Sequence, residues 1–145
     1  MPAPQIRVMV ADNHDMFRNG MAILLEAFED LTLAGMAADG HEVLELCGEI
    51  EPDVVLMDLN MPKMNGIVTI QILRQHQPQV QVVALISFGD EVLVEAAMAA
   101  GAVGYVMKDA PIDLVARTIR AAARNASVSG GEDGTTTLGT IPFNL

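Results

Sequence analysis

Tryptophan is absent from this chain of 145 residues, which also has only one tyrosine and one cysteine. A single cysteine, Cys47, excludes an internal disulfide framework and a cysteine-based metal site as organising features. With no tryptophan and a single tyrosine, the chain lacks the stacking platforms that bind single-stranded nucleic acid. Basic residues are also scarce, because 8 Lys and Arg face 19 Asp and Glu, for a formal net charge of −11. This charge argues against nucleic-acid binding by the chain itself, since phosphates attract Lys and Arg.

Long hydrophobic runs are missing as well, although 51% of the residues are apolar. No stretch approaches the roughly 20 apolar residues that a membrane helix needs, and residues 1–4 do not lead into a signal-peptide core. We therefore expect a cytoplasmic protein without membrane contact. The length suits one domain with a core large enough to fold without disulfides.

Apolar runs and helical patterns alternate five times along the chain. The runs predict strands at residues 6–11, 31–38, 54–58, 80–86 and 103–107. The patterns predict helices that start near residue 17 and at residues 40, 66, 90 and 112, and that end near residues 28, 50, 76, 100 and 124. This alternation predicts an α/β fold, a doubly wound sheet of five parallel strands in the flavodoxin-like order 2-1-3-4-5.

The alternating pattern ends close to residue 126. Residues 127–145 begin with the Ser, Gly and Thr composition of a linker and continue with a few apolar residues, Leu138, Ile141, Phe143 and Leu145. We expect residues 1–126 to form one domain and residues 127–145 to form a flexible linker or a C-terminal tail.

Four of the predicted strands end at a polar residue: Asp12, with Asn13 beside it, Asp58, Ser87 and Lys108. Because the carboxyl ends of parallel strands meet at one edge of a sheet, these side chains are expected to surround one shallow pocket. Two carboxylates placed together repel each other unless a cation lies between them, and oxygen ligands suit Mg²⁺ or Mn²⁺. Asp58 would then be a nucleophile toward a phosphoryl group whose oxygens contact Lys108 and Ser87.

Two segments resemble the receiver domains (CheY-like) of two-component response regulators, over about Ile6 to Asn125. Residues 57–66, MDLNMPKMNG, are similar to the D-L-x-M-P-x-M-x-G run of receivers, and residues 101–109, GAVGYVMKD, resemble the G-A-x-G-Y-x-x-K-D segment of the NarL/FixJ (LuxR-type) subfamily. The resemblance implies a signalling domain rather than an enzyme, phosphorylated on Asp58 by a sensor histidine kinase. It also implies Ser87 and Tyr105 as a coupled switch pair. The implied metal ligands are Asp12, Asn13, Asp58 and the backbone carbonyl of Asn60.

In that subfamily the receiver controls transcription through a C-terminal helix-turn-helix domain. None is present in this sequence, which is therefore expected to be a fragment or a stand-alone receiver. The resemblance implies a switching face formed by the fourth helix and fifth strand, and either this face or the fifth helix would serve a homodimer. Four apolar residues favour the fourth helix as a partner face: Leu93, Val94, Ala97 and Met98.

Two residues depart from the family pattern. Asn13 replaces the second acid of the receiver, so we expect weaker metal binding, since an amide offers only a neutral carbonyl oxygen. Phe88 follows the hydroxyl residue, where a small residue is usual, and could narrow the entrance to Asp58. These departures favour an alternative function, a receiver-like protein-interaction module that is not phosphorylated.

Structural roles compete with several of these assignments. Asn13 or Asp15 could cap the first helix and Ser87 the fourth, and Tyr105 could be a half-buried strand residue. Three histidines lack the spacing of metal ligands and are expected to be surface histidines or to have their hydrogen bonds satisfied: His14, His41 and His76.

Two cofactor or enzyme classes fit poorly. The start of the first helix resembles a D-x-H-x-x-G cobalamin motif, but Phe17 replaces its glycine. A dehalogenase-type phosphatase needs a second Asp where this chain has Asn60.

Overall fold

A computed structural model of the chain describes residues 5–127. The fifth helix extends to Ser127, the first residue of the expected tail. The rest of that tail, including its apolar residues Leu138, Ile141, Phe143 and Leu145, lies outside the described residues. The strands are β1 (Ile6–Ala11), β2 (Leu31–Ala37), β3 (Val54–Asp58), β4 (Gln81–Ile86) and β5 (Gly104–Met107). The helices are α1 (Asp15–Leu25), α2 (Gly40–Ile50), α3 (Gly66–His76), α4 (Val94–Ala100) and α5 (Ile112–Ser127), with a 3-10 turn η1 (Glu91–Leu93) before α4.

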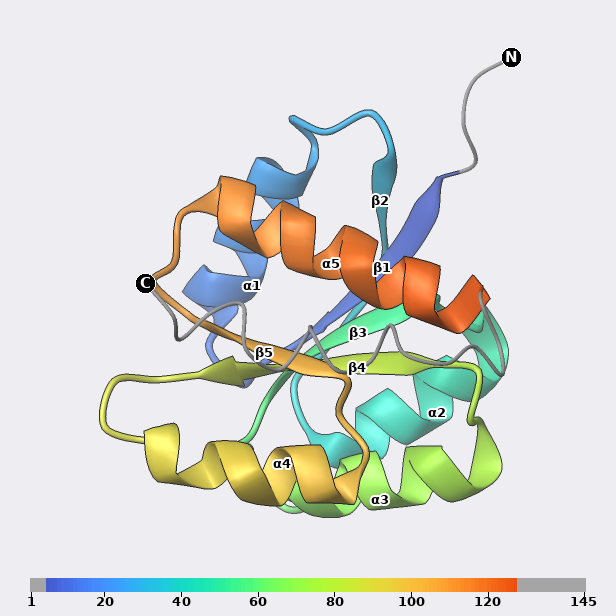
Figure 1. Cartoon of the computed structure of the whole chain (residues 1–145), viewed down its shortest axis with the longest axis vertical. Helices are drawn as coiled ribbons and strands as arrows, with labels where there is room; N and C mark the ends of the chain where they lie inside the picture. Colours follow the sequence, from blue (N-terminus) through green and yellow to red (C-terminus); the bar gives the residue numbers. More distant parts are fainter. Residues whose placement is uncertain (1–4, 128–145) are drawn as a thin grey trace.

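The five strands form one parallel sheet in the order β2-β1-β3-β4-β5, as the sequence predicted. Helices α1 and α5 cover one face of the sheet, and α2, α3 and α4 cover the other (Figure 1). The helices on each face pack against the strands and enclose a separate apolar core. Among residues 5–127 no helix combines the length and the apolar character that crossing a membrane requires.

Strand β3 lies at the centre of the sheet, and all five of its residues are buried. Its continuous apolar run from Val54 to Met57 suits a strand that helices cover on both faces. The strand also carries Asp58, which is only 3% exposed. The fold therefore buries a carboxylate at the carboxyl end of its central strand.

The fourth helix differs from the expected single helix over residues 90–100. The chain forms the turn η1 over Glu91–Leu93 and the α-helix only from Val94. Gly89 has a φ of 94°, and Asp90 makes no capping hydrogen bond with its side chain, so no strong signal starts an α-helix there. The first helix likewise ends at Leu25, and Phe28 packs on the core from the following turn.

Of the four residues expected to form a partner face on the fourth helix, Ala97 is completely buried and does not contribute to it. Leu93, Val94 and Met98 are partly buried and pack against the core beneath α4, so their use by a partner stays a prediction. Two large apolar side chains near this helix are exposed, Phe88 and Val92.

Candidate functional site

Three strands bring charged side chains together at their carboxyl ends. Asp12 follows β1, Asp58 ends β3, and Lys108 follows β5. The ammonium Nζ of Lys108 forms an ion pair with Asp12 Oδ2 and lies 3.9 Å from Asp58 Oδ2. The structure therefore brings the two predicted carboxylates and the predicted lysine into one cluster.

Burial governs the electrostatics of this cluster. Asp12 is completely buried, Asp58 is 3% exposed, and the Lys108 side chain is 16% exposed. Burial raises the pKa of Asp58 above its ordinary value, and the negative charge of Asp12 raises it further. A hydrogen bond from the Asn60 backbone N–H and the charge of Lys108 act in the opposite direction but do not cancel the rise.

We expect Asp58→Asn to stabilise the metal-free protein at neutral pH. A carboxyl group whose pKa is higher in the folded state weakens folding as pH rises above its unfolded pKa of about 4. The variant should therefore gain about 1 kcal/mol or more over the wild type, an advantage that grows with pH until Asp58 is fully ionised. Urea unfolding in a chelator between pH 4 and pH 8 measures this difference, with the exposed Asp109→Asn as control. Parallel curves for wild type and Asp58→Asn would contradict it.

The loop between β1 and α1 is held by Asp12. Its Oδ1 atom accepts a hydrogen bond of 2.8 Å from the backbone N–H of His14 and lies 2.8 Å from His14 Nδ1. The Arg18 guanidinium donates to the Asp12 carbonyl oxygen at 2.6 Å and pairs with Asp15. His14 is the N-cap residue of α1 and makes no capping bond, so the expected caps at Asn13 and Asp15 do not form.

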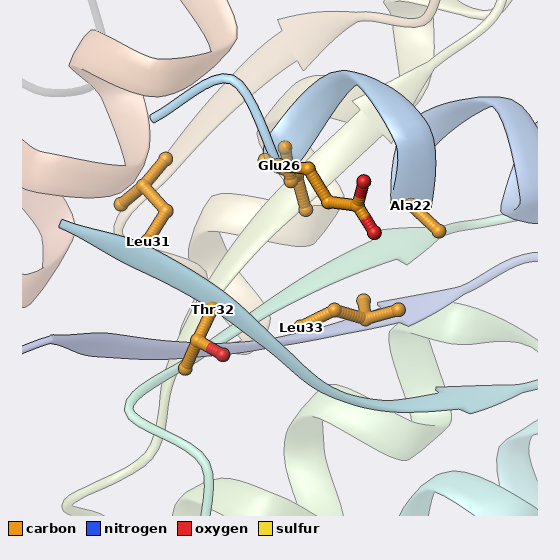
Figure 2. A pocket seen from close by; sticks show the side chains of 6 residues that line it. Ala22, Glu26, Leu31, Thr32 and Leu33 are labelled. Carbon is orange, nitrogen blue, oxygen red and sulfur yellow. The ribbon is translucent and has the colours of Figure 1, made fainter. Parts of the chain in front are cut away.

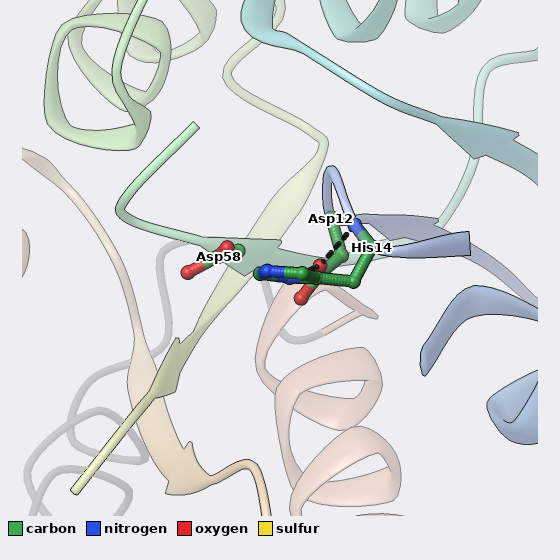
Figure 3. Close-up of side chains that lie close together, drawn as sticks. All are labelled: Asp12, His14 and Asp58. Atoms are coloured by element: carbon green, nitrogen blue, oxygen red, sulfur yellow. Dashed lines mark hydrogen bonds and ion pairs between the residues drawn. The ribbon is translucent and has the colours of Figure 1, made fainter. Parts of the chain in front are cut away.

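His14 is exposed and hydrogen-bonded to Asp12, as expected of a surface or satisfied histidine, but its position beside Asp58 was not predicted. Ligand atoms of Asp12, His14 and Asp58 all lie within 4.8 Å of one another, and Figure 3 shows the imidazole ring reaching from Asp12 toward Asp58. A second unexpected neighbour is Phe17, whose ring centre is 4.6 Å from Lys108 Nζ. Residue spacing does not reveal these contacts, because they depend on the path of the loop rather than on helical or strand periodicity.

The loop after β3 links the cluster to the start of the fourth helix. The backbone N–H of Asn60 donates to Asp58 Oδ1 at 3.2 Å, and the Asn60 side chain donates to Asp90 Oδ2 at 2.6 Å. Gly66 closes the loop, because its backbone N–H donates to the Leu59 carbonyl oxygen at 3.0 Å. Asn65 caps α3 by accepting from the Val68 N–H. The loop between β3 and α3 therefore fixes the orientation of the Asp58 carboxylate through hydrogen bonds at both of its ends.

The other predicted site residues lie around the cluster. Ser87 follows the last residue of β4 and is half-buried, whereas Asn13 is exposed. Tyr105 is 5% exposed within β5, where burial raises its pKa. Phe88 is 91% exposed, so its ring points into solvent in this conformation.

The donor set of the cluster fits a divalent cation. Two buried carboxylates supply oxygen ligands, and Asp12 Oδ2 is shielded from solvent with the Lys108 ammonium as its partner. A buried carboxylate oxygen of this kind needs a positive charge, which Lys108 partly provides. Oxygen atoms arranged around such a position are the ligands that Mg²⁺ and Mn²⁺ accept.

A hollow of about 280 Å³ lies elsewhere on the molecule, between the last turns of α1 and the first residues of β2 (Figure 2). Its walls are mostly aliphatic, from residues such as Leu25 and Leu33, with Glu26 at one side. Because β2 starts there, this hollow is at the amino end of the strands, opposite the Asp58 cluster. It therefore adds nothing to the chemistry of that cluster.

Several known proteins are similar to this chain in sequence. Residues 8–120 match the family described as response regulator receiver domain. The chain is 37% identical over 128 residues to the uncharacterized transcriptional regulatory protein YxjL of Bacillus subtilis, covering 88% of this chain and 59% of YxjL. It is 37% identical over 117 residues to the nitrate/nitrite response regulator protein NarL of Escherichia coli, covering 80% and 54%. The chain thus spans little more than half the length of these curated relatives.

A solved structure of a receiver domain is also similar to this chain. The signal receiver domain of the putative response regulator NarL from Mycobacterium tuberculosis superposes with a TM-score of 0.79 at 29% identity, covering 84% of this chain and 98% of that one. The resemblance found in the sequence is confirmed for the family and for its NarL-type members. The chain belongs to the response regulator receiver domain family.

Proposed function

We propose that this chain is a phosphorylation switch in which Asp58 accepts a phosphoryl group from a sensor histidine kinase. The observation that carries the proposal is the position of Asp58, which ends the central strand 3.9 Å from the ammonium of Lys108. In the transfer, a carboxylate oxygen of Asp58 forms a bond to phosphorus while the bond from phosphorus to the kinase imidazole nitrogen breaks. The electron pair of that bond returns to the imidazole ring.

The neighbouring groups support this chemistry. Lys108 and the Ser87 hydroxyl would contact the phosphoryl oxygens and stabilise the charge that they carry in transfer. Asp12, Asp58 and the Asn60 carbonyl would hold a divalent ion such as Mg²⁺, with Asn13 at its edge. The ion would supply positive charge that offsets repulsion between the incoming phosphoryl group and the two carboxylates.

The aspartyl phosphate would carry up to two negative charges, one more than the Asp58 carboxylate, and new acceptor oxygens. Ser87 would turn toward the phosphoryl group and Tyr105 would change its position, which alters the surface around α4 and β5. A ligand or modification must favour one state by about 5.5 kcal/mol to reverse a population of 1:99. Charge-assisted hydrogen bonds to a new phosphoryl group reach that size together.

Response regulators partner with sensor kinases in the cytoplasm and, as transcriptional regulators, reach DNA through a separate domain. We propose the same arrangement here, with this chain as the receiver and a homodimer formed at α4 and β5 or at α5. The net charge of −11 agrees with a receiver that leaves DNA contact to another domain.

Phosphorylation is testable without the kinase. Incubation with acetyl phosphate and millimolar Mg²⁺ should add one phosphoryl group to the intact protein, measured by mass spectrometry. Asp58→Asn should remove this mass gain completely, whereas the exposed Asp109→Asn should retain it. Beryllofluoride with Mg²⁺ should likewise protect the wild type and not Asp58→Asn against urea unfolding.

The alternative is a receiver-like module that works by protein contacts alone. It rests on exposed Asn13, which replaces the usual second acid, and on the 91% exposed ring of Phe88. A wild type that shows no mass gain and no beryllofluoride protection at millimolar Mg²⁺ would overturn phosphorylation and favour this alternative.

A further inference from the structure

The imidazole of His14 is positioned by the same aspartate that belongs to the cluster. Its Nδ1 atom lies 2.8 Å from Asp12 Oδ1, and this oxygen also accepts the backbone N–H of His14 at 2.8 Å. The side chain is 65% exposed, so one edge of the ring stays in solvent while the other faces the buried carboxylates. Figure 3 shows the ring between Asp12 and Asp58. One oxygen therefore contacts and positions both the backbone and the ring of His14.

The contact with Asp12 places a ring nitrogen beside a carboxylate oxygen. A neutral imidazole carries its proton on one nitrogen and a free electron pair on the other, so Nδ1 is a ligand atom when the proton is on Nε2. The Nδ1 atom and Asp12 Oδ1 lie 2.8 Å apart, a spacing that suits two neighbouring ligands of one ion, while Asp12 Oδ2 pairs with Lys108.

We propose that His14 supplies an imidazole nitrogen to the divalent ion held by Asp12 and Asp58, which gives the site a preference for first-row transition ions over Mg²⁺. The inference rests on the metal site of the proposed function and deepens it. Ligand atoms of these three residues lie within 4.8 Å of one another. Mg²⁺ favours oxygen ligands, whereas imidazole suits transition ions such as Ni²⁺ and, to a smaller extent, Mn²⁺.

The charges around the cluster favour a third strong ligand. Lys108 is already paired with Asp12 Oδ2 and lies 3.9 Å from Asp58, so a cation at this place competes with the ammonium for both carboxylates. A neutral nitrogen ligand strengthens the hold on the ion without adding a negative charge to a buried group. Asn13 is exposed, and its amide offers only a neutral carbonyl oxygen.

Calorimetric titration of Mg²⁺ and Ni²⁺ into the wild type and His14→Ala tests the proposal. Because His14 makes no capping bond, alanine removes no cap from α1. We expect the variant to lose at least about tenfold in Ni²⁺ affinity, since even outer partners of metal ligands cause losses of that size. Its Mg²⁺ affinity should change by less than about twofold. His41→Ala and His76→Ala, at exposed positions on other helices, should bind both ions as the wild type does.

Two further measurements make the test independent of folding and of phosphorylation. Electron spin echo of the Mn²⁺ complex should show nitrogen modulation in the wild type that disappears in His14→Ala. His14→Asp, which offers oxygen in place of nitrogen, should bind Mg²⁺ more tightly and Ni²⁺ more weakly than the wild type.

Equal losses for Mg²⁺ and Ni²⁺ in His14→Ala, or a wild type whose Mn²⁺ complex lacks nitrogen modulation, would overturn the proposal. A wild type that binds neither ion at millimolar concentration would also overturn it. These outcomes are distinct from failure of the proposed function, in which nitrogen modulation is present but acetyl phosphate leaves Asp58 unmodified.

Discussion

Gly66→Ala is expected to destabilise the folded protein by about 3 kcal/mol, the upper part of the range for an overpacked interior. A Cβ atom at this position would lie 2.6 Å from the Asp58 carbonyl oxygen and 2.7 Å from the Leu59 Cα. Both are backbone atoms, so the neighbour cannot rotate away as a side chain could. The loop that carries Asp58 would have to move, and with it the hydrogen bond from the Asn60 N–H to the carboxylate.

Urea unfolding followed by circular dichroism measures this effect, and Gly20→Ala provides a matched control. Gly20 lies inside α1, where an added Cβ would have no neighbour within 4 Å. Alanine there should stabilise the protein by up to about 1 kcal/mol, because it restricts the unfolded chain and favours the helix. Equal stability of Gly66→Ala and wild type would show that the turn before α3 can relax.

Lys108→Met is expected to cost about 3 kcal/mol of stability in the absence of metal. The substitution preserves much of the side-chain volume but leaves Asp12 and Asp58 as two buried carboxylates without a counter-charge. Removal of one partner from a buried ion pair typically costs about 3–5 kcal/mol. Because the Lys108 side chain is 16% exposed, we expect a cost at the lower end of this range. On the proposed function, phosphoryl capture from acetyl phosphate should also fall by about 10²–10³-fold, as for the loss of one charge-stabilising donor.

Lys63→Met is the control for this variant, because Lys63 is 69% exposed and lies 3.6 Å from Asp39 at the surface. Its loss should cost less than about 1 kcal/mol. Added Mg²⁺ should restore more stability to Lys108→Met than to the wild type, since a divalent ion replaces the missing positive charge. A loss in Lys108→Met no greater than that in Lys63→Met would contradict the role of Lys108 as counter-charge.

The sheet and its order were predictable because they depend on strong, local signals. Continuous apolar runs such as Val54 to Met57 mark strands buried on both faces, and right-handed crossovers leave few strand orders. The cluster of Asp12, Asp58 and Lys108 followed from the order, since neighbouring parallel strands carry their last residues to one edge. Their chemical roles stay predictions.

Details that depend on side chains from different elements were missed. His14 approaches Asp58 because Asp12 Oδ1 contacts both its backbone and its ring. An Asp favours the backbone contact as an Asx turn, but the contact with the ring depends on the path of the loop. Phe17 lies beside Lys108 for a similar reason, through the angle at which α1 leaves β1. The apolar residues of the fourth helix indicated a partner face, but Ala97 is buried against the sheet and its three apolar neighbours are partly covered by the core.

The burial of Tyr105 has a practical consequence. Tyr105 is the chain's one tyrosine, and tryptophan is absent, so the intrinsic emission of the protein comes almost entirely from a single fluorophore. That fluorophore is 5% exposed in β5, opposite Ala84 of β4. Quenching or a lifetime change therefore reports on one place in the sheet without any label attached to the protein.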